Sequence, residues 1–177
     1  VDVLTAVVGN LNAHGTFPRD GRHNTYAHGL QRHGQVIRHA VFLKRAGEGK
    51  CDILFLGDSI TQGWGNNAVW QKSYAPRNAV NFGIGGDTTQ NVLWRIQNGE
   101  IDGLSPKAVV LMIGTNNFGL HGDAPGDVAK GVAAIVQTLR KKLGASRILL
   151  LAVFPRDEKP GTDMRKKIAE LNKQIAT

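Results

Sequence analysis

Apolar residues from residue 36 onward fall into short runs that alternate with amphipathic stretches. Four runs have the length of buried strands, at residues 52–56, 79–82, 108–113 and 147–154, and each ends near a Gly or Pro. Helices are predicted between them, over residues 36–46, 68–74, 88–97, 126–143 and 163–176. In the longest, residues at helical spacing form one apolar stripe that includes Val128, Val132, Ile135 and Leu139.

Strands that are apolar throughout and alternate with helices indicate a parallel sheet buried on both faces. The sequence therefore predicts a doubly wound, flavodoxin-like α/β fold with helices on both faces of the sheet. Residues 1–35 are rich in Gly, Asn and His and are expected to form an irregular N-terminal arm. Residues 36–177 are expected to form one domain, a size that allows a real hydrophobic core.

Charge and composition narrow the possible functions. The formal net charge is +8, but the basic residues are scattered, which favours a solvated surface over nucleic-acid binding. No apolar run approaches the ~20 residues of a membrane-spanning helix. The apolar start at residues 1–8 lacks the basic segment of a signal peptide. Cys51 is the single cysteine and, at the start of a predicted buried strand, is expected to be an inert core thiol.

Five of the six histidines lie between His14 and His39. His28 and His33 are five residues apart, and His33 and His39 are six apart, and neither spacing is typical of a metal site. We interpret the histidines of the arm as exposed loop residues, and His39, in a predicted helix, as structural. No metal-binding or cofactor-binding residue is predicted.

Small and polar residues follow three of the predicted strands directly. These segments are Gly57-Asp58-Ser59, residues 83–87 and residues 114–117. Ligands of such sheets bind beyond the carboxyl ends of the strands, so the three segments are expected to form one rim. A serine at a strand-to-helix turn can act as a nucleophile, while the backbone N–H of Gly86 and the side-chain amide of Asn116 could bind an oxyanion.

An alternative ligand for this rim is a phosphate group held on backbone amides. Residues 83–86 superficially resemble a dinucleotide-binding loop, but they lack the full G-x-G-x-x-G spacing and follow the second strand, and no P-loop lysine is present. Nucleotide binding is therefore disfavoured.

The segments around the rim resemble known sequence blocks. Residues 55–64 (FLGDSITQGW), 81–95, 114–117 and 155–160 are similar, in order and spacing, to blocks of the SGNH/GDSL hydrolase superfamily, and more closely to its platelet-activating-factor acetylhydrolase β/γ-subunit branch. The resemblance implies a cofactor-free serine esterase acting on a small acyl ester such as an acetyl ester. It implies Ser59 as nucleophile, with Gly86 and Asn116 in the oxyanion hole, and it leaves Asp58, Asp87 and Asn117 to shape their loops.

The resemblance also predicts what this chain lacks. The family's final block carries an Asp and, three residues later, the catalytic His, and no Asp-x-x-His occurs near Thr177. His121 follows the third strand, but it does not fit the family pattern for the base. We therefore expect an SGNH hydrolase fold without its last strand and helix, truncated before this block, in which residues 147–154 form an open sheet edge.

Two further hypotheses follow from the missing block. The chain is either a catalytically inactive binding domain or a fragment whose open edge pairs with another copy or with a completing chain. The sequence does not indicate whether the protein is cytoplasmic or exported.

Overall fold

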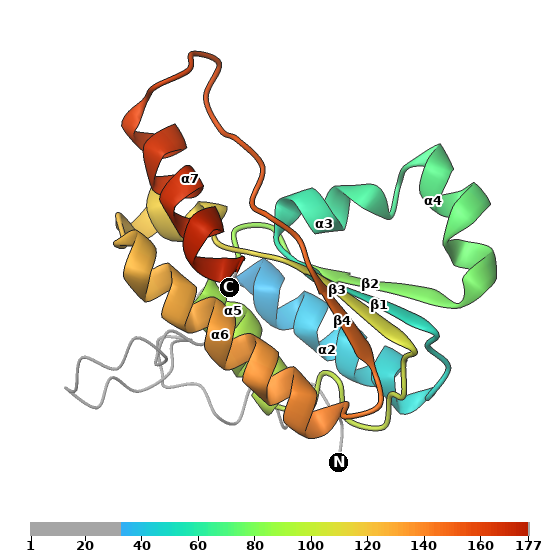
Figure 1. Cartoon of the computed structure of the whole chain (residues 1–177). Coiled ribbons are helices and arrows are strands. Elements are labelled where there is room, and N and C mark those ends of the chain that lie inside the picture. Colours follow the sequence, from blue (N-terminus) through green and yellow to red (C-terminus); the bar gives the residue numbers. More distant parts are fainter. Residues whose placement is uncertain (1–32, 177) are drawn as a thin grey trace.

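The computed structural model describes residues 33–176, so most of the predicted arm lies outside the described residues. The described chain alternates strands with helices (Figure 1). In order, the elements are α2 His33–Gly47, β1 Ile53–Gly57, α3 Ser59–Trp64, α4 Ala68–Ser73, the 3-10 helix η1 Ala75–Arg77, β2 Ala79–Gly83, α5 Thr89–Gln97, β3 Ala108–Met112, the π-helix η2 Asn117–His121, α6 Pro125–Lys142, β4 Arg147–Leu150 and α7 Asp163–Ile175.

The four strands form one parallel sheet in the order β2-β1-β3-β4. This order and the helices on both sides of the sheet confirm the predicted flavodoxin-like α/β fold (Figure 1). The direction of winding reverses between β1 and β3, so the loops that follow these two strands diverge at that point. Ligands of doubly wound sheets bind at this switch point.

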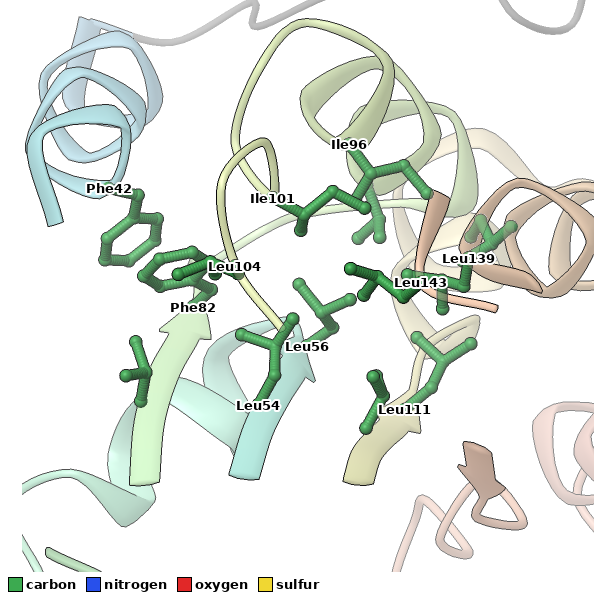
Figure 2. Close-up of a cluster of buried hydrophobic side chains, with 14 of the residues drawn as sticks. Phe42, Leu54, Leu56, Phe82, Ile96, Ile101, Leu104, Leu111, Leu139 and Leu143 are labelled. Atoms are coloured by element: carbon green, nitrogen blue, oxygen red, sulfur yellow. The ribbon is translucent and has the colours of Figure 1, made fainter. Parts of the chain in front are cut away.

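One face of the sheet carries the main core. Alternate strand residues point to it, among them Leu54, Leu56, Val109 and Leu111, none of which has any exposed surface. They pack against α2, α5 and α6, and Figure 2 shows Phe42, Ile96 and Leu139 of these helices facing the strands. A second cluster joins α6 to α7 through Val128, Ile168 and Leu171.

The opposite face of the sheet is covered unevenly. Over β1, Phe55 contacts the rings of Trp70 and Tyr74 at centroid distances of 5.0 and 5.2 Å. Over β3 and β4, an apolar cavity of about 400 Å³ remains, and Leu149 and Phe154 on its border are 55% and 50% exposed. Residues of β1, β3 and β4 line the cavity, together with Thr61, Trp64 and Tyr74 from the segment of α3 and α4.

Several element boundaries differ from the sequence-based expectation. The first described helix begins at His33, three residues earlier than predicted, so residues 33–35 are helical rather than irregular. α3 and the π-helix η2 were not predicted. No helix among residues 33–176 has both the length and the apolar character needed to span a bilayer.

β4 is shorter than the predicted strand at residues 147–154. Its last pair joins Leu150 to Leu111, and the Leu151 N–H then donates a bond of 2.9 Å to the Leu111 carbonyl. Two residues later, the side chain of Asn172 in α7 replaces a strand partner. Its Oδ1 accepts a bond of 2.8 Å from the Val153 N–H, and its Nδ2 donates one of 2.9 Å to the Val153 carbonyl.

Replacing Asn172 by Leu should therefore destabilise the segment that follows β4. The variant leaves the N–H and carbonyl of buried Val153 without partners, which we expect to lower the free energy of unfolding by about 1–3 kcal/mol. Urea unfolding measures the change. The matched control is Asn66→Leu, in the exposed turn between α3 and α4, and it should change stability by less than about 0.5 kcal/mol. Equal effects of the two substitutions would contradict the role of Asn172 as the partner of the Val153 backbone.

Candidate active site

Ser59 lies on the rim of the sheet, directly after β1, as the first residue of α3. Asp58 makes this turn, because its buried carboxylate accepts a bond of 2.9 Å from the Ile60 N–H and so caps α3. The prediction that Asp58 holds the turn is confirmed. Burial raises the pKa of the Asp58 carboxyl, whereas Ser59 itself is exposed to solvent.

Glycines at the ends of β1 and β2 let α3 lie directly on the sheet. A Cβ atom at Gly57 would lie 3.0 Å from the Thr61 Cβ of α3, and one at Gly83 would lie 2.8 Å from the Gln62 Cα. Neither position therefore accepts a side chain without displacing α3. The same fit brings Ser59 to the loop after β2, where a Cβ at Gly85 would lie 3.8 Å from the Ser59 Cβ.

The loop after β2 carries Gly86 and is fixed to α3. The N–H of Gly85 donates a bond of 2.7 Å to the side-chain oxygen of Gln62, and the N–H of Asp87 donates one of 3.2 Å to the carbonyl of Ile84. Gly86 has a φ of +81°, which residues with a side chain adopt only with strain. The backbone of this loop is thus held in one conformation beside Ser59.

Asn116 and Asn117 follow β3, and their side chains join the rim loops. The Nδ2 of Asn116 donates a bond of 2.9 Å to the Asp87 carbonyl. Asn117 is fully buried, and its Oδ1 accepts a bond of 3.0 Å from the Thr89 N–H at the start of α5. The structure thus brings Ser59, Gly86 and Asn116 to one part of the rim, and Asn117 shapes its loop as predicted.

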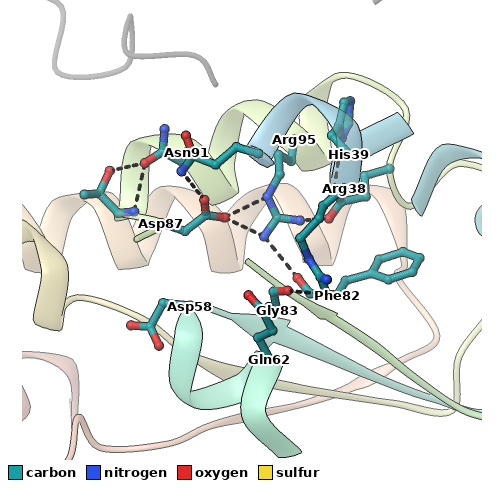
Figure 3. A network of polar contacts seen from close by, with 12 residues as sticks. Arg38, His39, Asp58, Gln62, Phe82, Gly83, Asp87, Asn91 and Arg95 are labelled. Carbon is teal, nitrogen blue, oxygen red and sulfur yellow. Dashed lines mark hydrogen bonds and ion pairs between the residues drawn. The ribbon is translucent and has the colours of Figure 1, made fainter. Parts of the chain in front are cut away.

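A buried cluster of charged side chains lies behind the glycine loop (Figure 3). Arg95 of α5 lies between the carboxylates of Asp87 and Glu100, and all three side chains are fully buried. Burial is the largest influence on Asp87 and raises the pKa of its carboxyl to about 6, against the opposing effect of Arg95. The expected loop-shaping role of Asp87 is consistent with this cluster.

Sequence reasoning gave no role to Arg95, Glu100 or Gln35. The available signal was the position of Arg95 on α5, three residues after Val92 and next to Ile96, both fully buried. A charged residue on the core-facing side of an amphipathic helix requires a buried partner. The spacing of charged residues along the sequence did not reveal that Asp87 and Glu100 are these partners.

Neither His39 nor Cys51 is exposed on the rim as a reactive group. His39 is 1% exposed, and its Nδ1 lies 2.9 Å from Glu100, so its predicted structural role is confirmed. His121 is exposed at the end of η2. Burial raises the pKa of the Cys51 thiol to about 11, as expected for an inert core residue. Among residues 33–176, no group of three or more His, Cys, Asp or Glu side chains could hold a metal ion.

Comparison with known proteins places these features in a family. Residues 55–177 match the GDSL-like lipase/acylhydrolase family. The chain belongs to this family. Human platelet-activating factor acetylhydrolase IB subunit alpha2 is 40% identical over 140 residues, which cover 79% of this chain and 59% of that protein. Bovine subunit alpha1 is 36% identical over 137 residues, covering 77% and 57%. The chain thus spans less than two thirds of the length of these relatives.

Solved structures share the fold of this GDSL-like chain. A GDSL-like lipase from Bacteroides thetaiotaomicron superposes with a TM-score of 0.64 at 20% identity, over 78% of this chain and 71% of that one. A member of the lipolytic G-D-S-L family from Veillonella parvula gives a TM-score of 0.59 at 22% identity, over 71% and 70%.

The buried carboxyl of Asp87 predicts a specific pH dependence of stability. Its pKa is about 6 in the folded protein against an ordinary value of 3.8, so the folded state binds this proton more tightly than the unfolded state does. The stability that results is fully present below about pH 4 and is lost as the pH rises through about 6. Asp87→Asn removes the titrating group.

Urea unfolding of both proteins at several values between about pH 4 and pH 7 tests this. We expect the free energy of unfolding of the wild type to fall with rising pH relative to that of Asp87→Asn. A difference between the two proteins that stays constant over this range would contradict the prediction.

Proposed function

We propose that the protein carrying this sequence is a serine ester hydrolase that removes a small acyl group, such as acetyl, from its substrate. The observation that carries the proposal is the placement of Ser59 beside the Gly85–Gly86 loop, to which Asn116 is hydrogen bonded. Membership of the GDSL-like family and the acetylhydrolase names of its relatives support the choice of reaction and acyl group.

In this proposal the Ser59 hydroxyl attacks the ester carbonyl carbon and forms a tetrahedral intermediate. The negative charge on the former carbonyl oxygen is bound by the N–H groups of Ser59 and Gly86 and by the Asn116 side-chain amide. An amide nitrogen carries two hydrogens, and only one of those on Asn116 is used by the Asp87 carbonyl. The other is left to donate to the oxyanion. The intermediate expels the alcohol, and water then releases the acyl group from Ser59.

The attack requires a base that takes the Ser59 proton. Among the described side chains of residues 34–176, no imidazole or carboxylate group forms a hydrogen bond with the Ser59 hydroxyl, and His39 is bound to Glu100 in the interior. We therefore assign the base to residues outside the described part of the chain. An isolated serine hydroxyl is a poor nucleophile, so the described residues without that base would support only low activity.

Hydrolysis of p-nitrophenyl acetate by the protein as its gene encodes it tests the assignment. Ser59→Ala should lower kcat/KM at least about 1,000-fold, because only water remains as a nucleophile and only the residual catalysis of the oxyanion donors is left. Asn116→Ala should lower kcat about 100- to 1,000-fold through the loss of one oxyanion donor.

Ser105→Ala is the matched control, since Ser105 is exposed in the loop before β3, and its activity should equal that of the wild type. Hydrolysis by Ser59→Ala at the wild-type rate would refute the proposal.

A non-catalytic binding domain is the second candidate. It is favoured by the uncovered apolar cavity beside β4 and by the open edge of β4, which pairs with no other strand among residues 33–176. An unpaired edge strand with exposed apolar side chains is prone to pair with another chain. In this alternative, the edge binds a strand of another copy or of a completing chain.

Light scattering during size-exclusion chromatography of the 177-residue chain tests this edge. If β4 pairs between copies, the wild type should be a dimer or larger. Leu149→Lys should then be monomeric, because a charged side chain on the edge opposes pairing. Val69→Lys is the control, since Val69 is 53% exposed on α4, and it should leave the oligomer intact. A monomeric wild type would rule out pairing between copies.

A further inference from the structure

Asp87 connects the two groups proposed to bind the oxyanion. It directly follows Gly86 in the chain, and its backbone carbonyl accepts the 2.9 Å hydrogen bond from the Asn116 side chain. The orientation of the Asp87 peptide therefore affects both the Gly86 segment and the Asn116 amide. Because the side chain and the carbonyl belong to the same residue, a group that binds the Asp87 side chain also restrains this peptide.

Both carboxylate oxygens of Asp87 are held by buried donors (Figure 3). Oδ2 accepts a bond of 2.9 Å from the Nε of Arg95, and the Arg95 Nη2 lies 2.8 Å from the same oxygen. Oδ1 accepts a bond of 2.7 Å from the side-chain amide of Gln35 in α2. The carboxylate is thus bound from two different helices and has no exposed surface.

Arg95 is in turn bound by partners on several sides, which fix the position of its guanidinium group. Its Nη1 donates to the carboxylate of Glu100, and its Nη2 donates a bond of 3.1 Å to the Phe82 carbonyl at the end of β2. The other oxygen of Glu100 lies 2.9 Å from the His39 Nδ1 in α2. A continuous buried network therefore runs from α2 and β2 to the glycine loop.

General stability is a weak explanation for such a network. Burial of charged groups costs several kcal/mol per ion, and apolar side chains of the same volume often stabilise a protein equally well. Apolar side chains could not, however, hold a carboxylate in a fixed orientation beside the rim. The fork of donors on a guanidinium can do so, because its geometry is rigid.

We propose that Arg95 is a positioning residue for the oxyanion-binding loop. It fixes Asp87, and through Asp87 it orients the Gly86 N–H and the Asn116 side-chain amide. This inference rests on the proposed function of those two donors. Arg95 touches no substrate in this role.

The test compares Arg95→Met, Arg95→Lys and a control, Arg45→Met, in the protein as its gene encodes it. Arg45 lies in the last turn of α2 and bonds to the Lys50 carbonyl, near the amino ends of the strands. The first measurement is the ¹H–¹⁵N NMR spectrum, observed at the Gly86 N–H and at the Asn116 side-chain amide. The second is the separate determination of kcat and KM for p-nitrophenyl acetate.

We expect Arg95→Met to shift both sets of NMR signals and to lower kcat about 10- to 100-fold, with KM changed less than about twofold. Arg95→Lys should restore part of kcat, since an ammonium group can still donate to Asp87. Arg45→Met should change neither measurement. Signals of Gly86 and Asn116 at their wild-type positions in folded Arg95→Met would overturn the inference, as would an unchanged kcat.

A milder variant covers the case in which Arg95→Met does not fold. Gln35→Leu removes the bond to the Asp87 Oδ1 and leaves Arg95 in place, so it should shift the same signals in the same direction by a smaller amount. No shift in this variant would also overturn the inference. The NMR result does not depend on catalysis, so a protein that fails the Ser59→Ala test still gives a separate answer about Arg95.

Discussion

The close approach of α3 to the ends of β1 and β2 is the contact on which the rim depends. Gly57 and Gly83 lie opposite each other in the strand register, and neither has room for a Cβ atom. A methyl group at either position would push α3 away from the sheet and Ser59 with it. Gln62 of the same helix also binds the Gly85 N–H, so α3 links the serine to the glycine loop.

Backbone contacts place Ser59, whereas buried side chains place the groups around it. Asn116 and Asn117 join the loop after β3 to the loop after β2, through the Asp87 carbonyl and the Thr89 N–H. Arg95 in turn binds the Asp87 carboxylate of the loop after β2. Removal of one member of such a network leaves other buried polar groups unsatisfied, so the effects of single substitutions there should not be additive.

The fold was predictable because its strands and helices have clear periodicity. The rim was predictable because its small and polar segments directly follow three strands, and ligands of such sheets bind at the carboxyl ends of the strands. Local signals were weaker for α3, which has only six residues and contains Gly63. β4 was predicted too long because the apolar run continues to Phe154 after β3, its partner, has ended. The charged network could not be found by spacing, because Gln35 and Asp87 are 52 residues apart, and His39 and Glu100 are 61 apart.

The two edge strands of the sheet, β2 and β4, receive side-chain hydrogen bonds only near their carboxyl ends among the described residues. At the end of β2, guanidinium groups from two helices bind backbone carbonyls: Arg95 binds that of Phe82, and Arg38 binds that of Gly83 at 3.2 Å. Beside β4, Asn172 binds the backbone only at Val153, beyond the strand itself. Both guanidinium groups therefore bind the end of β2 that leads into the glycine loop. The open edge borders the apolar cavity, so a chain that paired with β4 would lie next to that cavity and would bury Leu149 as it bound.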